Sequence, residues 1–511
     1  MEIRKLSNRR EFLKLAALGA AGGAILAACG PAPAPTATPA PAKPAAEAPK
    51  PTEAPKPAAT TAPAAPTAAP AATATTAPAA KPTEAAPAAK PAASKATGTV
   101  VVWAGGLAAT DTSTGAAAAQ ASWAKWIKTN FEAKNPGVTL KPEDHGWDQA
   151  LRTALLTAIA GGNVPEVTTG EAFVHEFAAL GAFTDLRDAG IQASQFAPGP
   201  VAGSIYQGKL FGVPIVTSPF ALETNIRTAK KAGLDPEKPP KTWDELVANS
   251  QTAFKAGQAM AAAEKFVGFS LYGPAPNRIY GAVLRTIPWI NQTGKPLGDD
   301  DGTQAFMNAP EHIPAYELSR KLFATADPGN VFSGDEGKLY AYLWQDKAVY
   351  QASATWNIQN ALDAKAECVY HPLPRKDPNV SGNVVLGNEV YSPLKKAKNL
   401  DGAFTFLQFM ADPETQKQCG IVLGTRLPTV KSVLQDPGLE KLAAYAPKAK
   451  AIRAFADILV NEKVSPVPPY AKNADKIWIA WGDAFGKILQ TKDDIKKILD
   501  DLQAQVVKLL G

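Results

Sequence analysis

The stretch from Gly208 to Asn225, GKLFGVPIVTSPFALETN, constrains the fold of this chain more than any other. It opens with a turn signal at Gly208-Lys209, and a strand-like apolar run that contains Pro214 follows. A second apolar piece comes after Ser218-Pro219. A strand that is interrupted in this way can leave one sheet and enter another. The stretch therefore predicts that the chain crosses here between two lobes.

Two helices follow the crossing, and the sequence signals where they begin and end. The first is predicted from Arg227 to about Ala232, and it ends at Gly233. The second opens at Trp243, with Thr242 as its N-cap and Glu245 as the capping-box partner. These signals place helical structure directly after the crossing strand.

The chain before the crossing alternates between strand and helix signals. Strands are expected at Gly98–Trp103, at Val138–Pro142 and from Glu166, with helices at Ser122–Ala133 and from Trp147 to a stop at Gly161-Gly162. This order implies an α/β fold in which the strands pair in parallel and helices cover both faces. Ligands of such sheets bind beyond the carboxyl ends of the strands.

The N-terminal 29 residues form an export signal. Asn8–Lys14 contains paired arginines followed by Phe-Leu-Lys, which fits a twin-arginine signal. The apolar region Leu15–Ala28, about 14 residues long, is too short for a stable membrane span. It ends in Leu26–Gly30, which resembles a bacterial lipobox and predicts that Cys29 is lipidated; the alternative is a non-lipidated signal with a chance cysteine.

Residues 30–97 are a low-complexity segment of Pro, Ala and Thr. Such a composition cannot bury enough apolar surface to offset the entropy of ordering it, and repeated proline favours extended structure. The segment is therefore expected to be a disordered tether between the membrane and the folded part.

Composition and motifs exclude several classes of function. The net charge of +6 is small for 511 residues and shows no concentrated basic face for nucleic acid. The cysteines and the four histidines lack metal-ligand spacing, and no catalytic or phosphate-binding motif is present, so neither an enzyme nor a cofactor is predicted. Cys368 and Cys419 either form a disulfide in an oxidising compartment or are two unrelated buried thiols. A β-rich adhesion module is disfavoured by the α/β alternation and the absence of repeats.

Several segments carry a resemblance to a known family: FEAKNPG, GKLFGVPI, KKAGLD, PKTWDEL and LPTVKSV, in this order. Together they are similar to the extracellular solute-binding proteins of ABC importers, of the maltodextrin-binding class; Thr224-Asn225 stands where that family usually has Tyr-Asn. The resemblance implies the two-lobed, hinge-linked type II periplasmic-binding-protein fold, with parallel-dominated sheets flanked by helices. It divides the chain into the signal 1–29, the tether 30–97, lobe 1 at 98–216 and 375–432, and lobe 2 at 217–374 and 433–511.

The resemblance also implies a ligand cleft between the lobes, where aromatic rings stack on a sugar and polar groups bind its hydroxyls. Trp356 and Trp478 match aromatic positions of the family, although each of them, and the neighbouring Trp481, can also be a core residue. Glu171 can equally be a solvated loop carboxylate, and Asp148 can serve a helix N-terminus. The predicted ligand-binding residues are Trp356, Trp478, Glu171, Phe173, Trp147, Asp148, Ser218, Asn357, Glu389 and Arg426, with Arg278 and Tyr280 as weaker candidates.

The function implied is capture of a small solute, foremost a sugar or oligosaccharide, and its delivery to the permease subunits of an ABC transporter. The protein is expected to act as a monomer that is lipid-anchored at the extracytoplasmic face of the bacterial membrane. The alternatives are the same role for a glycerophosphodiester, a peptide or a polyamine, or a surface-anchored glycan hydrolase.

Overall fold

The computed structural model describes the folded part of the chain. The described residues are 96–511, apart from 112–114, 171–172, 277, 437, 439–447, 466 and 469. The chain divides into two units, Met1–Pro87 and Ala88–Gly511, and every described element belongs to the second. The predicted export signal, Cys29, residues 30–95 of the tether, and Glu171 lie outside the described residues. Among the residues that the structure describes, no helix combines the length and apolar character of a membrane span.

The N-terminal part of the sheet confirms the predicted strand and helix order. Strand β1 (Gly98–Trp103) pairs in parallel with β2 (Val138–Glu143) on one side and with β3 (Val167–Thr169) on the other. Helix α2 (Gly115–Lys134) connects β1 to β2, and α3 (Asp148–Gly161) connects β2 to β3. Helix α3 ends where the sequence predicts, because Gly162 adopts the left-handed conformation (φ 70°) that a side chain would strain.

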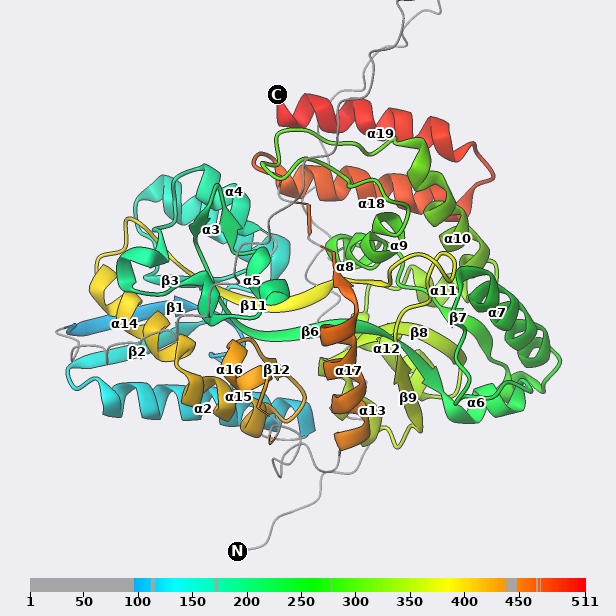
Figure 1. The fold of residues 1–511 in the computed structure, drawn as a ribbon, viewed down its shortest axis with the longest axis horizontal. Helices are drawn as coiled ribbons and strands as arrows, with labels where there is room; N and C mark the ends of the chain where they lie inside the picture. Colours follow the sequence, from blue (N-terminus) through cyan, green and yellow to red (C-terminus); the bar gives the residue numbers. More distant parts are fainter. Residues whose placement is uncertain are drawn as a thin grey trace, which may run out of the picture. The chain divides into compact units, whose positions relative to one another are not determined.

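The crossing strand is β6 (Val213–Asn225), and all its residues are buried. Its first part pairs with β11 (Leu386–Pro393) and β12 (Leu427–Pro428), and its second part, from Phe220, pairs with β8 (Ala348–Ala354) and β9 (Cys368–His371). The two apolar pieces expected from the sequence are thus one continuous strand. Figure 1 shows β6 running through the middle of the fold, from the elements around β1 to those around β8.

The sheet is mixed rather than dominated by parallel pairs. The strands β1, β2 and β3 pair in parallel, as do β7 (Val267–Ser270) and β8. The pairings of β6 and the contact of β11 with β3 are antiparallel. The difference arises because the strand-helix-strand units give parallel pairs, whereas β6 and β11 run against the strands they join. The expectation of parallel-dominated sheets is corrected in this respect.

Helices cover the β7–β8 end of the sheet. Helix α6 (Ile226–Lys231) follows β6, and α7 (Trp243–Gln258) begins with the predicted capping box, in which Thr242 accepts from the backbone of Glu245. Residues 279–291 form two short helices, α8 (Ile279–Leu284) and α9 (Ile287–Asn291). The break precedes Pro288, which cannot donate a backbone hydrogen bond within a continuing helix.

The remaining elements pack around this framework. Two described thiols, Cys368 on β9 and Cys419, are free rather than disulfide-bonded. The elements not yet mentioned are α4 (Val174–Ala179), α5 (Pro198–Ala202), β4 (Ile205–Tyr206), β5 (Lys209–Leu210), α10 (Ile313–Phe323), α11 (Pro328–Val331), α12 (Glu336–Trp344), α13 (Ile358–Asp363), β10 (Asn383–Val384), α14 (Leu400–Ala411), α15 (Pro413–Leu423), α16 (Lys431–Leu434), α17 (Ala449–Asn461), β13 (Lys463–Val464), α18 (Ala474–Gln490) and α19 (Ile495–Leu510).

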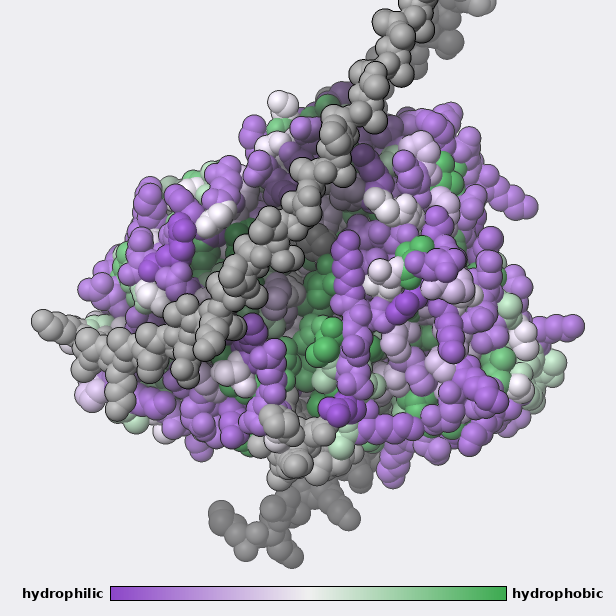
Figure 2. Space-filling view, viewed as in Figure 1, coloured by the Kyte–Doolittle hydropathy of each residue, from purple (hydrophilic) through white to green (hydrophobic). Residues whose placement is uncertain are grey.

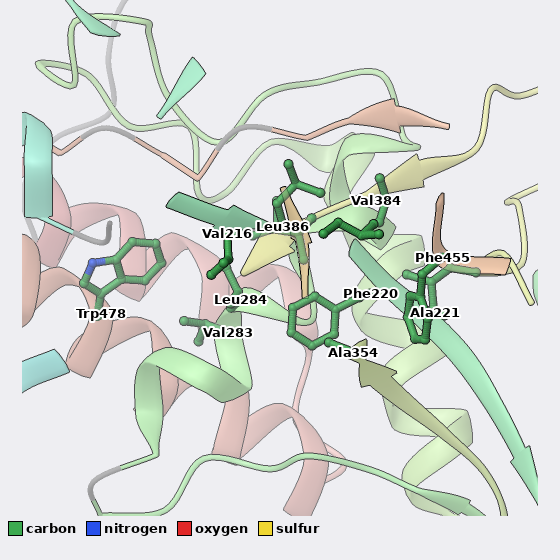
Figure 3. Packing of buried hydrophobic residues seen from close by; sticks show 14 of the residues in the cluster. Val216, Phe220, Ala221, Val283, Leu284, Ala354, Val384, Leu386, Phe455 and Trp478 are labelled. Carbon is green, nitrogen blue, oxygen red and sulfur yellow. The ribbon is translucent and has the colours of Figure 1, made fainter. Parts of the chain in front are cut away.

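A continuous apolar core extends along β6. It joins Val100 on β1 to Val216 and Phe220 on β6 and to Val349 on β8. In Figure 3 the ring of Phe220 lies beside Ala354. Figure 2 shows polar residues over most of the visible face, with apolar residues gathered in the middle, where β6 and β11 pass in Figure 1. One apolar core therefore contacts both ends of the sheet, and β6 contributes residues to it along its length.

Candidate functional site

One cavity of about 650 Å³ combines residues from distant parts of the chain. Its volume lies within the range of small-molecule binding sites. Its lining comes from the start of α3, from β6 and β11, from the segment around α8, from the turn after β8 and from the start of α18. Six of the predicted ligand-binding residues line it: Trp147, Phe173, Trp356, Glu389, Arg426 and Trp478.

Trp356 lies in the turn that follows β8 and is only partly buried. Its ring meets Phe220 edge to face at 5.5 Å, and the Arg426 guanidinium lies 5.3 Å from the ring centroid. The backbone of Gly387 passes beneath the ring: a Cβ added there would lie 2.6 Å from a ring carbon. A glycine on β11 therefore allows Trp356 to take its place in the cavity wall.

Trp478 lies on α18 and is buried, yet it lines the cavity. Its ring contacts Tyr280 edge to face at 5.1 Å and stacks on Trp481 at 5.5 Å. The neighbouring Trp481 belongs to the core, where its indole donates to the Tyr316 hydroxyl at 2.9 Å. The indole nitrogen of Trp478 has no hydrogen-bond partner among the described residues, so the cavity wall holds a buried donor that a solute can satisfy.

The other predicted residues differ in their positions. Phe173 is buried in the wall, and Trp147, which precedes α3, is 52% exposed at its rim. The carboxylate of Glu389 accepts from the Tyr391 hydroxyl at 2.6 Å. Arg278 and Tyr280, the weaker candidates, also line the cavity.

Ser218 and Asn357 are buried but do not line the cavity. The Ser218 hydroxyl lies 2.7 Å from the Thr355 hydroxyl and accepts from the Thr355 backbone, so it joins β6 to the turn that carries Trp356. The Asn357 amide donates to Ser353 at 3.1 Å. Both side chains therefore form hydrogen bonds that stabilise the turn after β8. Asp148 is the first residue of α3.

A buried ionic cluster connects two walls of the cavity. Arg152 on α3 donates to both carboxylate oxygens of Glu176, at 2.5 and 2.7 Å, and its third nitrogen lies 3.0 Å from Asp475 on α18. Burial lowers the pKa of Arg152, but the hydrogen bonds and charge of Glu176 and the charge of Asp475 outweigh this and raise it. Arg152 therefore stays charged and ties α3 to α18.

Several lining residues were not among the sequence candidates: Arg152, Phe220, Tyr272, Arg285, Glu336 and Asp475. Most lie inside helices or strands, where a polar residue gives no sign of which cavity it faces. Arg278 and Arg285 flank the short helix α8, whose end at Leu284 only the structure shows. Within the described part of the chain, no group of three or more His, Cys, Asp or Glu side chains is placed to hold a metal ion.

Comparison with known proteins identifies the family. Residues 126–447 match the model described as bacterial extracellular solute-binding protein, which is more than half of the 511 residues. The chain belongs to this family. Its relatives include proteins that are named as periplasmic binding proteins.

Two relatives illustrate the similarity. One, from Sinorhizobium fredii, is named "Probable amino-acid ABC transporter periplasmic-binding protein y4oP"; it is 24% identical over 306 residues, 58% of this chain and 64% of that protein. The other is the sn-glycerol-3-phosphate-binding periplasmic protein UgpB of Escherichia coli, 30% identical over 308 residues, 56% of this chain and 67% of that protein. The matched region thus spans about two thirds of these relatives.

Solved structures support the fold. An ABC transporter solute-binding protein from Thermotoga lettingae, bound with α-D-tagatose, superposes with a TM-score of 0.65 at 17% identity, over 81% of this chain and all of that one. The fold is the two-lobed, hinge-linked type II fold of periplasmic binding proteins, as the sequence predicts, with a mixed sheet flanked by helices.

Proposed function

We propose that this protein captures a small hydroxylated solute outside the cytoplasm and delivers it to the permease of an ABC importer, with sugars as the first class to test. The observation that carries the proposal is that aromatic rings and charged groups line the cavity of about 650 Å³ together. Aromatic faces stack on the C–H patches of a sugar, while carboxylates and guanidinium groups bind its hydroxyls. The family and the fold support the same role.

The mechanism we propose is binding and closure rather than catalysis. With lobe 1 taken as 98–216 and 375–432, and lobe 2 as 217–374 and 433–511, the cavity lining comes from both lobes. Trp147 and Glu389 then belong to lobe 1, and Trp356 and Trp478 to lobe 2. A solute that contacts both lobes favours the closed conformation, and the permease then recognises that conformation.

The position at the membrane is part of the proposal. Export by the twin-arginine route, lipidation of Cys29 and a tether over residues 30–97 would hold the folded part at the outer face of the cell membrane. In cells that express the full chain, Cys29→Ser should move the protein from the membrane fraction to the soluble extracytoplasmic fraction. Unchanged fractionation of the variant would contradict the anchor.

A thermal-shift screen of the full chain tests the solute-binding role. The compounds are sugars, polyols, amino acids, peptides, polyamines and glycerophosphodiesters. A ligand at ~100 times its Kd stabilises the native state by about 2.7 kcal/mol. The unfolding entropy of about 2.1 cal/mol/K per residue gives roughly 1 °C per kcal/mol for a folded part of about 410 residues, so the expected rise in Tm is about 3 °C.

Matched tryptophan variants then test the site. Trp356→Ala should reduce the ligand-induced shift, because it removes a stacking face from the cavity. The control is Trp126→Ala: Trp126 is also partly buried, but it packs on Trp123 and Phe409 instead of lining the cavity. The control should lower the Tm of the free protein and leave the ligand shift intact. Absence of binding in the whole screen, together with turnover of a glycan in a parallel assay, would replace the proposal with the hydrolase.

One observation favours a second class of solute within the same role. The relative UgpB is named for sn-glycerol-3-phosphate, and four arginines line the cavity of this chain: Arg152, Arg278, Arg285 and Arg426. A phosphorylated solute is therefore the second candidate.

A further inference from the structure

Two buried arginines flank α8 and face the cavity. Arg278 precedes the helix and is 4% exposed; Arg285 follows it and is 7% exposed. Both line the cavity. A buried guanidinium is costly unless its charge and its five N–H groups are compensated, so the partners of these two side chains decide what they are for.

The hydrogen-bond partners leave part of each guanidinium unused. Arg278 donates from Nη2 to the backbone oxygen of Val331 at 3.0 Å, while its Nε and Nη1 have no partner among the described residues. Arg285 donates from Nη1 to the backbone oxygen of Gly281 at 2.6 Å and from Nη2 to the Tyr340 hydroxyl, and its Nε has none. The acceptors are neutral in both cases, so the bonds hold the side chains without neutralising them.

The carboxylates of the cavity do not neutralise the two arginines either. Asp475 is paired with Arg152 at 3.0 Å, and Glu389 accepts from Tyr391. Glu336 is exposed and acts on Arg278 through its charge, but it makes no ion pair with either arginine in the described structure. Burial lowers the pKa of Arg278, which expresses the cost of its uncompensated charge.

Aromatic rings hold the two guanidinium groups in fixed positions. The ring of Tyr272 lies 4.7 Å from the Arg278 guanidinium and 3.7 Å from that of Arg285. The Arg285 guanidinium also lies 4.7 Å from the ring of Phe220. These contacts recover part of the desolvation cost, and they remove the side-chain freedom that a ligand would otherwise have to freeze.

We propose that Arg278 and Arg285 form an oxyanion subsite, so that the solute carries a phosphate ester or a carboxylate on its hydroxylated body. The unused N–H groups match the oxygen atoms of such a group, and guanidinium forks bind planar or tetrahedral oxyanions with two parallel hydrogen bonds. The anion lies at Arg278 and Arg285, and the rest of the solute contacts the rings of Trp356 and Trp478, which line the same cavity. The inference rests on the proposed solute-binding function and specifies the charge of its ligand.

Pairs of ligands that share a carbon skeleton, one anionic and one neutral, separate this inference from the proposed function. Titration calorimetry of the full chain compares sn-glycerol-3-phosphate with glycerol, and glucose-6-phosphate and glucuronate with glucose; the best compound of the thermal-shift screen is added with its own charged or neutral counterpart. We expect the anionic member of at least one set to bind about ten- to a hundredfold more tightly than the neutral one, as hydrogen bonds to charged groups contribute. The phosphate and carboxylate arms tell which oxyanion is preferred.

A pair of arginine variants locates the effect. Arg278→Gln should lower the affinity for the anionic member much more than the affinity for the neutral member, so that the advantage of the anionic member disappears. The control is Arg320→Gln, since Arg320 on α10 also donates to backbone oxygens, those of Ile488 and Asp493, but lies outside the cavity lining. The control should keep the advantage. The comparison of charged with neutral ligands on the unaltered chain remains decisive if Arg278→Gln does not fold.

The outcomes are distinguishable. An anionic advantage that is lost only in Arg278→Gln supports the subsite. Equal or tighter binding of the neutral members overturns the oxyanion inference and leaves the solute-binding function standing, as does an anionic advantage that survives Arg278→Gln. Binding of no compound at all overturns the proposed function, and the inference with it.

Discussion

Replacing Arg152 by Met should destabilise the protein strongly, because it leaves a buried carboxylate without its partner. The Glu176 side chain is 4% exposed, while that of Asp475 is 19% exposed. Breaking a buried ion pair costs about 3–5 kcal/mol, whereas a partly solvated partner costs less, on the order of 1 kcal/mol. Glu176 therefore dominates the loss, and the expected fall in Tm is roughly 3–6 °C at about 1 °C per kcal/mol.

Differential scanning calorimetry of the full chain at pH 7 measures this effect. The double variant Arg152→Met with Glu176→Gln should recover much of the loss, because the carboxylate that was stranded becomes a neutral amide. Asp475→Asn alone should lower the Tm by only about 1 °C. A fall of less than about 2 °C in Arg152→Met, or a double variant no more stable than the single one, would refute the argument that a buried charge sets the cost.

Two further predictions concern the cavity wall and the response to pH. Gly387→Ala should weaken solute binding about tenfold or more and change the tryptophan fluorescence, since its Cβ would lie 2.6 Å from the ring of Trp356. The control Gly334→Ala, where a Cβ meets nothing within 4 Å, should change neither the affinity nor the fluorescence. Unchanged affinity of Gly387→Ala would contradict the close contact. Burial lowers the pKa of His175 and His312, although their hydrogen bonds to backbone oxygens partly oppose this. The stability that the two neutral side chains contribute is therefore present above the pKa of 6.5 in the unfolded chain, and it is lost as the pH falls through their lower pKa values in the folded protein. Thermal melts from pH 7 to pH 5 should show a falling Tm, with a shallower slope in His312→Gln, and an equal slope in that variant would count against the assignment.

Local signals predicted much of the fold. The stop of α3 at Gly162 and the capping box of Thr242 depend on the conformations and hydrogen bonds of adjacent residues, which the sequence states directly. The mixed character of the sheet was not predictable in the same way, because strand direction depends on how the chain returns through β6 and β11.

The candidate site was predicted in part. Trp356 and Glu389 follow or belong to strands that meet β6, so their arrival at one cavity could be expected from the order of the elements. Ser218 lies in the same region, yet its hydroxyl is taken up by Thr355. A hinge position in the sequence therefore indicates proximity to the site, and the local hydrogen bonds decide whether a side chain is available.

The sequence by itself determined the order of strands and helices and the crossing at β6, because each of these depends on residues that are close together in the chain. It also determined the family resemblance, which depends on short segments that follow one another in a fixed order. Tertiary structure alone decided which side chains face the cavity. Trp478 and Trp481 lie on one turn of α18, yet packing against Tyr316 buries Trp481 in the core while Trp478 lines the cavity. The contact of Arg152 with Asp475 likewise joins residues from distant parts of the chain. Burial and charge pairing depend on which neighbours cover a surface, and those neighbours are set only when the chain has folded.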